Sequence, residues 1–553
     1  MEFSKLIEYL EEVESTQANL EKTEYLSELY SNAGEDLENV MMLSLGRISP
    51  KWEDLDLGVS SKTLVKIISK ASGRKEREVE EKWKTSGDLG DAAEKMIEGK
   101  TQQRLMSREL TVENVMQRLR KVAEMEQQGL SQSVDQDKKQ KLLADLLSSA
   151  EPDEARYLAR MMLENLRIGI GEGTVRDALD QAFLDGESSE EIQRAYDYSN
   201  DFRRVASAAR QGVEALRKIN LELYRPVNSM LAQKVDTIEE GFETVGEPAA
   251  VDFKYDGLRA QIHLKDGEAK IFTRRLEDVT EQFPDVKAFI EKAVDSENCI
   301  IDSEIVGVRD GEVIPFQELS KRIKRKYEIE KLRNEIPVEI RPFDIIYLEE
   351  SLMSRPYSER WESLESVIEE DENVKLVDRK LTSEEEEVNQ MQQESLGQGH
   401  EGVMMKSLDA RYKPGKRVGY MVKLKPVMET LDLAVVGAQW SEGRKSGWLG
   451  RLKLGCYNEE KNKYEMVGRM SSGLTDKQLE EITERLKPLI ESEDGRDVEL
   501  RPEVILEVEY EEIQDSPTYD SGYALRFPRL KQFRDDKEKA DSKEKVEALF
   551  EGQ

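Results

Sequence analysis

The sequence predicts a multidomain protein with an all-α N-terminal part, an α+β middle part and a β-barrel C-terminal part. Its 553 residues are more than one hydrophobic core normally serves. Apolar residues recur at helical spacing up to about residue 215, and short apolar runs rich in β-branched residues follow. Beyond residue 426, strand-like runs succeed one another with only turn residues between them.

The first region, residues 1–215, is expected to be helical. Val112, Val115, Met116, Leu119 and Val122 form one amphipathic stripe. The polar stretch 127–141 predicts a loop between helices. A break is expected at a proline in the segment 214–233, which joins this region to the next.

The middle region, residues 216–426, alternates short strand-like runs with charged helical stretches, which is typical of an α+β domain. Its strand-like runs are AAVDFKY, AQIHLK, AKIFT, CIIDSEIVGV and IIYL. In the last region, residues 427–553, the runs are LDLAVVGAQW, RLKLGCY, KYEMVGRM and VILEVEYEEI, followed by a charged tail. This series predicts a small barrel of the oligonucleotide-binding (OB) type.

Composition limits the chemistry. Cys299 and Cys456 are the only cysteines, so neither a disulfide framework nor a zinc site is expected. Because His263 and His400 are the only histidines, neither a Ser-His-Asp triad nor a multi-histidine metal site is expected. Catalysis should rest on Lys, Arg, Asp and Glu. No apolar run approaches the ~20 residues of a membrane span, and the N-terminus lacks a secretory pattern, which favours a cytoplasmic protein with no membrane partner.

The net charge is −33, from 83 basic and 116 acidic residues. Alone, this balance argues against nucleic acid, because nucleic-acid-binding domains usually carry a basic footprint. Two interpretations stay open: the protein does not bind DNA, or its acidic residues cover surfaces away from the DNA, as in proteins adapted to high intracellular salt. At about 1 M salt the screening length is only about 3 Å, so distant like charges hardly interact. Composition alone does not decide between these interpretations; salt adaptation, which would suit a haloarchaeal origin, is favoured only because the sequence motifs point to DNA.

The most informative segment is KYDG at residues 254–257. Taken alone, Lys254 is a lysine beside a turn-forming Asp-Gly pair, as in many hairpins. Five further segments follow it in order: IDSEIVG, RPFDIIYL, EGVMMK, VKLKP and RFPRLKQFRDDK. The six segments resemble the motif series of covalent nucleotidyltransferases, and the whole chain resembles archaeal-type ATP-dependent DNA ligases.

The resemblance implies an all-α DNA-binding domain at residues 1–215, a nucleotidyltransferase (adenylation) domain at 216–426 and an OB-fold domain at 427–553. It implies that the chain seals nicks in duplex DNA with ATP and Mg²⁺, acting as a monomer, and that a sliding clamp is a candidate partner. By the same resemblance Lys254 carries AMP. Attack on a phosphate needs a neutral amine, whereas a free lysine has a pKa near 10.4, so neighbouring cations or desolvation must lower it.

The resemblance also assigns contacts to ATP and to metal. Asp252 takes the place of an adenine-side acid that is often Glu in the family, and Phe343 is implied to stack on adenine, although a core phenylalanine is the alternative. Glu304 and Glu401 are the candidate magnesium ligands, because magnesium prefers oxygen donors. The other implied ATP contacts are Arg259, Arg274, Glu304, Arg417 and Lys423, with Lys425 on the same face of its strand as Lys423.

Three further segments are candidates for contact with DNA or with the ATP site. NLRIGIGEGTVRDAL, residues 165–179, resembles a backbone-contacting element; Gly169, Gly171 and Gly173 allow close approach, and Thr174 is expected to cap the following helix. KRIKRK, residues 321–326, is a basic run that suits either a DNA contact or a solvated face. In RFPRLKQFRDDK, the residues implied to visit the ATP site are Arg526, Arg529 and Lys531.

Three other functions fit part of the pattern. An RNA ligase or an mRNA-capping guanylyltransferase would share the lysine motif, but the long helical region favours a DNA ligase. A non-catalytic nick-binding protein would share the DNA-binding parts, but Lys254 is present. Formation of a covalent adduct and sealing of DNA against RNA strands separate these functions.

Overall fold

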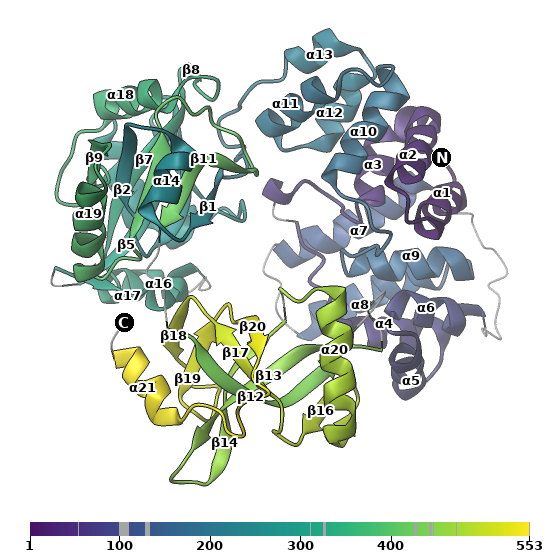
Figure 1. Ribbon diagram of the computed structural model, residues 1–553. Helices are drawn as coiled ribbons and strands as arrows, with labels where there is room; N and C mark the ends of the chain where they lie inside the picture. Colours follow the sequence, from purple (N-terminus) through teal and green to yellow (C-terminus); the bar gives the residue numbers. More distant parts are fainter. Residues whose placement is uncertain are drawn as a thin grey trace. The chain divides into compact units, whose positions relative to one another are not determined.

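The computed structural model describes residues 1–53, 55–98, 110–127, 133–309, 311–323, 328–424, 429–441, 445, 447–471 and 473–551 (Figure 1). Contacts divide the chain into two compact units. One unit comprises Met1–Ile67 and Thr101–Pro426, and the other comprises Ile68–Lys100 and Val427–Gln553. No helix within these described ranges is both long enough and apolar enough to cross a membrane.

The N-terminal part of the chain is helical, as its apolar periodicity predicts. The predicted stripe of α7 is buried along its whole length, from Val112 to Val122. The helices are α1 (Phe3–Ser15), α2 (Asn19–Asn32), α3 (Leu37–Ser44), α4 (Ser61–Ser72), α5 (Glu76–Ser86), α6 (Leu89–Glu98), α7 (Val112–Gln127), α8 (Ser133–Leu147), α9 (Pro152–Met162), α10 (Glu172–Phe183), α11 (Ser189–Ser199), α12 (Phe202–Ala209) and α13 (Val213–Arg217).

The loop predicted at residues 127–141 is wrong over most of its length. Residues 128–132 lie outside the described residues, but α8 begins at Ser133. Its inward face includes Lys139, which is buried and lies 2.6 Å from Glu126 Oε2, together with Leu143 and Leu147. The polar residues that suggested a loop are thus one side of an amphipathic helix whose apolar side begins only near its middle.

The glycine-rich loop at residues 168–171 is shaped by a buried lysine. Lys22 Nζ donates to the carbonyls of Ile168 and Gly169, at 2.7 and 3.1 Å. Gly169 has φ +66°, and a Cβ there would lie 2.7 Å from that Nζ, so a side chain would strain the backbone and displace the lysine. The predicted cap is wrong: α10 begins after Gly171, which places Thr174 within the first helical turn.

Two sheets form the frame of the middle region (Figure 1). The five-stranded sheet has the order β1-β11-β10-β2-β9, and the six-stranded sheet has the order β4-β3-β5-β7-β8 with β6 paired to β5. Helices α14 and α19 pack on the first sheet, and α15, α16 and α18 pack on the second. The strands are β1 (Leu231–Val235), β2 (Ala249–Phe253), β3 (Leu258–Lys265), β4 (Glu268–Thr273), β5 (Cys299–Arg309), β6 (Glu312–Ile314), β7 (Val338–Leu348), β8 (Glu350–Ser351), β9 (Arg379–Thr382), β10 (Val403–Ser407) and β11 (Arg417–Leu424). The helices are α14 (Ile238–Val245), α15 (Pro284–Ala293), α16 (Phe316–Ile323), α17 (Ile329–Glu335), α18 (Tyr357–Val367) and α19 (Glu385–Gly397).

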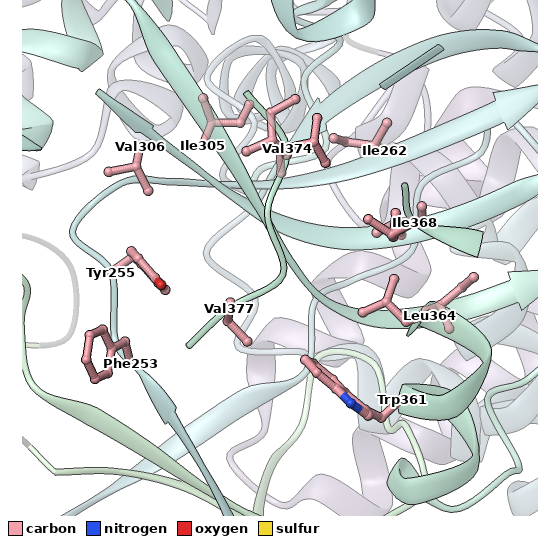
Figure 2. Close-up of a cluster of buried hydrophobic side chains, with 14 of the residues drawn as sticks. Phe253, Tyr255, Ile262, Ile305, Val306, Trp361, Leu364, Ile368, Val374 and Val377 are labelled. Carbon is pink, nitrogen blue, oxygen red and sulfur yellow. The ribbon is translucent and has the colours of Figure 1, made fainter. Parts of the chain in front are cut away.

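The cores of this region hold the two sheets together. The larger cluster draws on both sheets and their helices, and Figure 2 shows part of it, including Phe253, Tyr255, Val306 and Val377. A smaller cluster lies between the sheets: Ile300 of β5 packs in it with Met421 of β11.

The basic run at residues 321–326 is partly structural. Arg322 is 1% exposed and makes two hydrogen bonds to the Asp285 carboxylate, at 2.9 and 2.6 Å. A guanidinium that is buried and doubly paired cannot also bind DNA, so this residue holds α16 to α15 instead. Residues 324–326 of the run lie outside the described residues.

The last region is rich in strands, as predicted. Its main sheet has the order β14-β13-β12-β16-β15, with β17 paired to β12 and to β20, and β18 pairs with β19. Among the described residues no ladder joins β14 to β15, so this path stays open. The charged tail forms α21, which buries Val546 against the strands. The elements are β12 (Leu431–Trp440), β13 (Leu449–Asn458), β14 (Lys463–Met470), α20 (Asp476–Leu486), β15 (Ile490–Asp494), β16 (Asp497–Leu500), β17 (Ile505–Glu509), β18 (Glu512–Asp515), β19 (Tyr523–Arg526), β20 (Arg529–Phe533) and α21 (Lys543–Glu551).

Candidate active site

Lys254 directly follows β2 and is fixed by the loop that leads into β10. Its N–H donates to the Gly402 carbonyl at 2.8 Å, and its own carbonyl accepts the N–H of Glu401 at 2.8 Å. Its Nζ forms an ion pair with Glu401 Oε2. Both side chains stay partly exposed, so a ligand can reach them. The predicted nucleophile and a predicted metal ligand, 147 residues apart in sequence, are therefore in direct contact.

The KYDG turn is held from several sides. A Cβ on Gly257 would lie 2.5 Å from the carbonyl oxygen of Ile305, so β5 passes too close for any side chain there. Asp256 Oδ2 accepts the N–H of Phe316, the first residue of α16, at 3.2 Å. Tyr255 Oη donates to Asp378 Oδ2 at 2.5 Å. Lys254 thus extends from a rigid turn, which suits a group that must meet a phosphorus atom in line.

Glu304 lies on β5 directly opposite Arg259 of β3. Burial raises the pKa of Glu304 to about 8; the cations Lys254 and Arg259 oppose this shift, and the carboxylates Glu401 and Asp256 add to it. These five charged groups therefore form one electrostatic cluster. An added cation would favour the ionised form of Glu304.

Arg259 is oriented by two hydrogen bonds. Its Nη1 donates to the Met230 carbonyl at 2.8 Å, and its Nη2 donates to Asp302 Oδ2 at 2.8 Å. Asp302 is fully buried. The guanidinium carbon lies 5.2 Å from the centre of the Phe343 ring. Arg259 and Phe343, both predicted ATP contacts, are thus neighbours on the face of the six-stranded sheet that looks toward the other sheet.

Phe343 is the extra residue of a β-bulge. Asp302 of β5 pairs with Asp344, and Ser303 pairs with Pro342, so Phe343 has no partner in the ladder. Pro342 has no N–H to donate, which suits a bulge. Bulges redirect a side chain, and the Phe343 ring is only partly buried, with Lys406 Nζ 4.9 Å from its centre. The local backbone therefore presents this ring differently from its buried neighbours.

Asp252 lies next to buried cations, and this contact was not predicted from the sequence. Its Oδ2 is 2.5 Å from Lys406 Nζ, and its Oδ1 is 3.8 Å from Arg379 Nε. Tyr357 Oη lies 3.4 Å from the same carboxylate. Asp252 Oδ1 is buried and has no hydrogen-bond partner among the described residues. Strand alternation could have predicted this contact. Lys406, the last residue of EGVMMK, lies on the same face of β10 as Met404, which pairs with Asp252.

The remaining predicted contacts are more dispersed. Lys423 pairs with Met404, which pairs in turn with Asp252, so the three face the same side of the five-stranded sheet. Arg417 begins β11 and is exposed, as is Arg274 just after β4. In the part of the chain that the structure describes, no hydrogen bond or ion pair joins either arginine to the Lys254 cluster. Lys425 lies outside the described residues.

In the last region, RFPRLKQFRDDK spans β19 to the residues after β20. Arg526 Nη1 lies 2.9 Å from Glu512 Oε2, and Lys531 Nζ lies 3.1 Å from Glu507 Oε1. Arg529 begins β20 and is exposed. Two cations that sequence reasoning passed over, Arg534 and Lys537, both pair with the buried carboxylate of Asp432.

The donor set near Lys254 suits a loosely held magnesium ion. Within the described ranges, no group of three or more His, Cys, Asp or Glu side chains is arranged to hold a metal. Magnesium in nucleotide-dependent enzymes usually takes one or two carboxylates and completes its shell with water and phosphate oxygens. Glu304 and Glu401, which both interact electrostatically with Lys254, match that smaller requirement.

Comparison with protein families gives three matches along the chain. Residues 2–180 match the DNA ligase N terminus, residues 229–425 match the ATP dependent DNA ligase domain, and residues 445–537 match the ATP dependent DNA ligase C terminal region. Lys254 and every other residue predicted to bind ATP or metal in the middle region lie within the second match.

Curated relatives match this chain over its whole length. A DNA ligase of Nanoarchaeum equitans is 41% identical, over 100% of this chain and 99% of that protein. A DNA ligase of Archaeoglobus fulgidus is 39% identical, over 100% and 98%. The solved structure titled Pmar-Lig_PreS3 has a TM-score of 0.61 and 17% identity, over 96% of this chain and 99% of that one, and supports the fold alone. The chain belongs to the ATP-dependent DNA ligase family.

Proposed function

We propose that this ligase seals nicks in duplex DNA through a covalent intermediate in which Lys254 carries AMP. The observation that supports this role is the cluster of Lys254, Glu401, Glu304 and Arg259, which come from the turn after β2, the loop before β10, and strands β5 and β3. Sealing of such nicks is a reaction that DNA replication, repair and recombination require.

In the first step Lys254 Nζ attacks the α-phosphorus of ATP. A nitrogen–phosphorus bond forms, the bond from that phosphorus to the bridging oxygen breaks, and pyrophosphate leaves with that oxygen. The amine must lose a proton, and Glu401 Oε2, its direct partner, is the nearest acceptor. The positive charge of Arg259 would stabilise the negative charge that develops on the phosphate oxygens.

Recognition of ATP is assigned to the facing surfaces of the two sheets. Phe343, freed from its ladder by the bulge, would stack on adenine, and Asp252, whose Oδ1 has no hydrogen-bond partner among the described residues, would lie on the adenine side. Asp252 is shorter than the Glu that is common in the family, and Lys406 already occupies its other oxygen. Lys423 shares the face of Asp252 and would contact the α-phosphate; Arg274 and Arg417 are proposed as further ATP contacts.

Glu304 and Glu401 would hold the magnesium ion. When bound, the ion would neutralise charge on the phosphates as the leaving group departs. Glu304 must be ionised to serve as a ligand, and its raised pKa makes that ionisation depend on the cations around it.

In the later steps AMP passes from Lys254 to the 5′-phosphate at the nick, and the 3′-hydroxyl then attacks that phosphate. The second attack forms the phosphodiester and releases AMP. We assign these DNA contacts to a helical domain at residues 1–215 and an OB-fold domain at 427–553, with an adenylation domain at 216–426. The family matches at 2–180, 229–425 and 445–537 support this division. Action as a monomer and contact with a sliding clamp stay predictions of the resemblance.

The deciding experiment is sealing of a nicked all-DNA duplex with ATP and Mg²⁺, beside the same nick with RNA on either side. We expect sealing of the DNA nick and a mass increase of one AMP on Lys254. A Lys254→Ala variant should form no adduct, while a DNA nick already carrying 5′-AMP should still be sealed by the wild type without ATP. A folded wild type that forms no adduct, or that seals only RNA-containing nicks, would overturn the proposal.

A further inference from the structure

Alternate side chains of β3 hold the backbone of the segment that leads into β1. His263 Nδ1 accepts the N–H of Tyr224 at 3.0 Å. Gln261 exchanges two hydrogen bonds with Val227, accepting its N–H at 2.9 Å and donating to its carbonyl at 3.4 Å. Residues two apart on a strand face the same side, so Gln261 and His263 both bind this backbone from one face of β3. Residues 224–230 are called the docked linker below.

Gln261 has every polar position of its amide in use. Oε1 accepts from Val227 and from His263 Nε2, the latter at 3.0 Å, and Nε2 donates to Val227 and to Asp302 Oδ1, the latter at 3.3 Å. A side-chain amide offers two donors and two acceptor sites, and all four are filled here. Because the Val227 N–H can only donate, it fixes which end of the amide is oxygen.

Only one protonation state and one tautomer of His263 fit this arrangement. It is fully buried, and burial lowers its pKa to about 3, so the ring is neutral near pH 7. Because Nδ1 accepts from the backbone of Tyr224, the single ring proton lies on Nε2 and is donated to Gln261. The direction of each hydrogen bond from the docked linker to Gln261 is therefore determined.

The same network ends on Arg259. Asp302, bound by Gln261 through Oδ1, accepts Arg259 Nη2 at 2.8 Å and Tyr412 Oη at 2.6 Å through Oδ2. Met230, at the end of the docked linker, accepts Arg259 Nη1 at 2.8 Å and donates its N–H to Tyr412 Oη at 3.2 Å. Linker, glutamine, aspartate and arginine thus form a closed set of hydrogen bonds, in which each group restricts the others.

We propose that Gln261 is a positioning residue for the ATP-dependent first step. By clamping the docked linker and Asp302 together, it fixes the guanidinium of Arg259. Both terminal nitrogens of Arg259 bind this network, and its Nε has no hydrogen-bond partner among the described residues. The inference rests on the proposed contact of Arg259 with ATP. It adds that the orientation of this contact depends on a side chain and a linker that do not touch the nucleotide.

The test compares Gln261→Met with the wild type in two reactions of the full chain. Methionine keeps the length of the side chain and removes all four hydrogen bonds. We expect the KM for ATP in formation of the Lys254 adduct to rise about 10- to 100-fold, because small displacements of a positioning group cost that much. Sealing of a nick that already carries 5′-AMP should stay within about twofold of the wild type, since a local positioning effect spares that step.

Gln261→Glu provides a second variant if the methionine variant does not fold. Glutamate keeps the acceptors for Val227 and His263, loses the donors to the Val227 carbonyl and to Asp302, and places a second carboxylate beside Asp302. The KM for ATP should rise again. The matched control is Ser303→Ala, a fully buried polar residue on the neighbouring strand β5 that is outside the network, and it should leave the KM unchanged.

Two results would overturn the inference: an unchanged KM in a folded Gln261 variant, or an equal loss in both reactions, which indicates a purely structural role. Arg259→Ala separates this failure from that of the proposed function. If Arg259→Ala raises the KM and the Gln261 variants do not, only the positioning role fails. If Arg259→Ala has no effect either, the proposed ATP contact fails with it.

Discussion

Asp252 and Lys406 form a buried ion pair on neighbouring strands, with Oδ2 and Nζ 2.5 Å apart and side chains only 2% and 7% exposed. The pair lies next to the ring of Phe343, because Lys406 Nζ is 4.9 Å from the ring centre. The residue predicted to lie near adenine therefore also balances a buried lysine. A change at Asp252 should affect stability as well as nucleotide binding.

We expect Asp252→Asn to lower the free energy of unfolding by about 3–5 kcal/mol, because it leaves Lys406 charged and buried with its carboxylate removed. Urea denaturation of both proteins measures the difference. The matched control is Asp371→Asn, which breaks a pair with Lys292, a side chain that is 75% exposed, and should cost much less. Equal, small losses in both variants would show that the buried pair is solvated in solution.

Lys254→Ala should abolish the covalent AMP adduct and all sealing that starts from ATP, because it removes the amine that is proposed to attack ATP and that pairs with Glu401. Intact-protein mass spectrometry after incubation with ATP and Mg²⁺ reports the adduct. Lys292→Ala, an exposed lysine on α15, is the control and should form the adduct at the wild-type rate. An adduct on the Lys254→Ala protein would place the nucleophile elsewhere.

Phe343→Ala should weaken ATP binding, since stacking of a base on an aromatic ring contributes about 1–3 kcal/mol. That range corresponds to a KM for ATP raised about 5- to 150-fold. Phe343→Trp, which keeps a flat ring, should retain most of the binding. Phe289→Ala removes another partly buried phenylalanine, on α15, and should lower Tm without changing the KM. If Phe343→Ala behaves like Phe289→Ala, Phe343 is a core residue only.

The carboxyl of Glu304 should make stability depend on pH. Burial raises its pKa to about 8, whereas a glutamate in an unfolded chain titrates near about 4.3. Between these values the folded chain holds a proton that the unfolded chain has lost, so this group's contribution to stability falls as pH rises through that window. Glu304→Gln does not ionise, and its Tm relative to the wild type should be several degrees higher at pH 9 than at pH 5. Glu372→Gln is the exposed control. A Tm difference between Glu304→Gln and the wild type that is the same at both pH values would contradict the raised pKa of Glu304.

Sealing should increase with KCl if the net charge of −33 reflects adaptation to high salt. Added salt screens the repulsion among 116 acidic residues, and in an ordinary DNA-binding protein the same salt weakens phosphate contacts. A rate series from about 0.1 M to about 2 M KCl, with far-ultraviolet circular dichroism as a check of folding, separates the two effects. Best activity at the lowest salt would reject salt adaptation.

Short motifs and local periodicity determined much of what the sequence revealed. The KYDG segment and its five companions predicted Lys254 as the nucleophile and named its contacts in order, and apolar spacing predicted the helical, mixed and strand-rich regions. Both signals lie within a few residues along the chain, where strand and helix periods and turn chemistry act. Predictions that needed burial were less secure: Arg322 is an internal ion-pair partner, Thr174 is not a cap, and α8 replaces most of a predicted loop.

The tertiary structure alone decided which distant groups meet. It brings Lys254 to Glu401, sets Lys406 and Arg379 around Asp252, and frees Phe343 by a bulge. The hydrogen-bond network from the docked linker through Gln261 to Arg259 was likewise visible only in the tertiary structure. These arrangements join segments that are far apart in sequence, and their energies depend on burial and register, which no local pattern encodes. The sequence by itself determined which chemistry the chain carries; folding decided how its groups are oriented and what holds them.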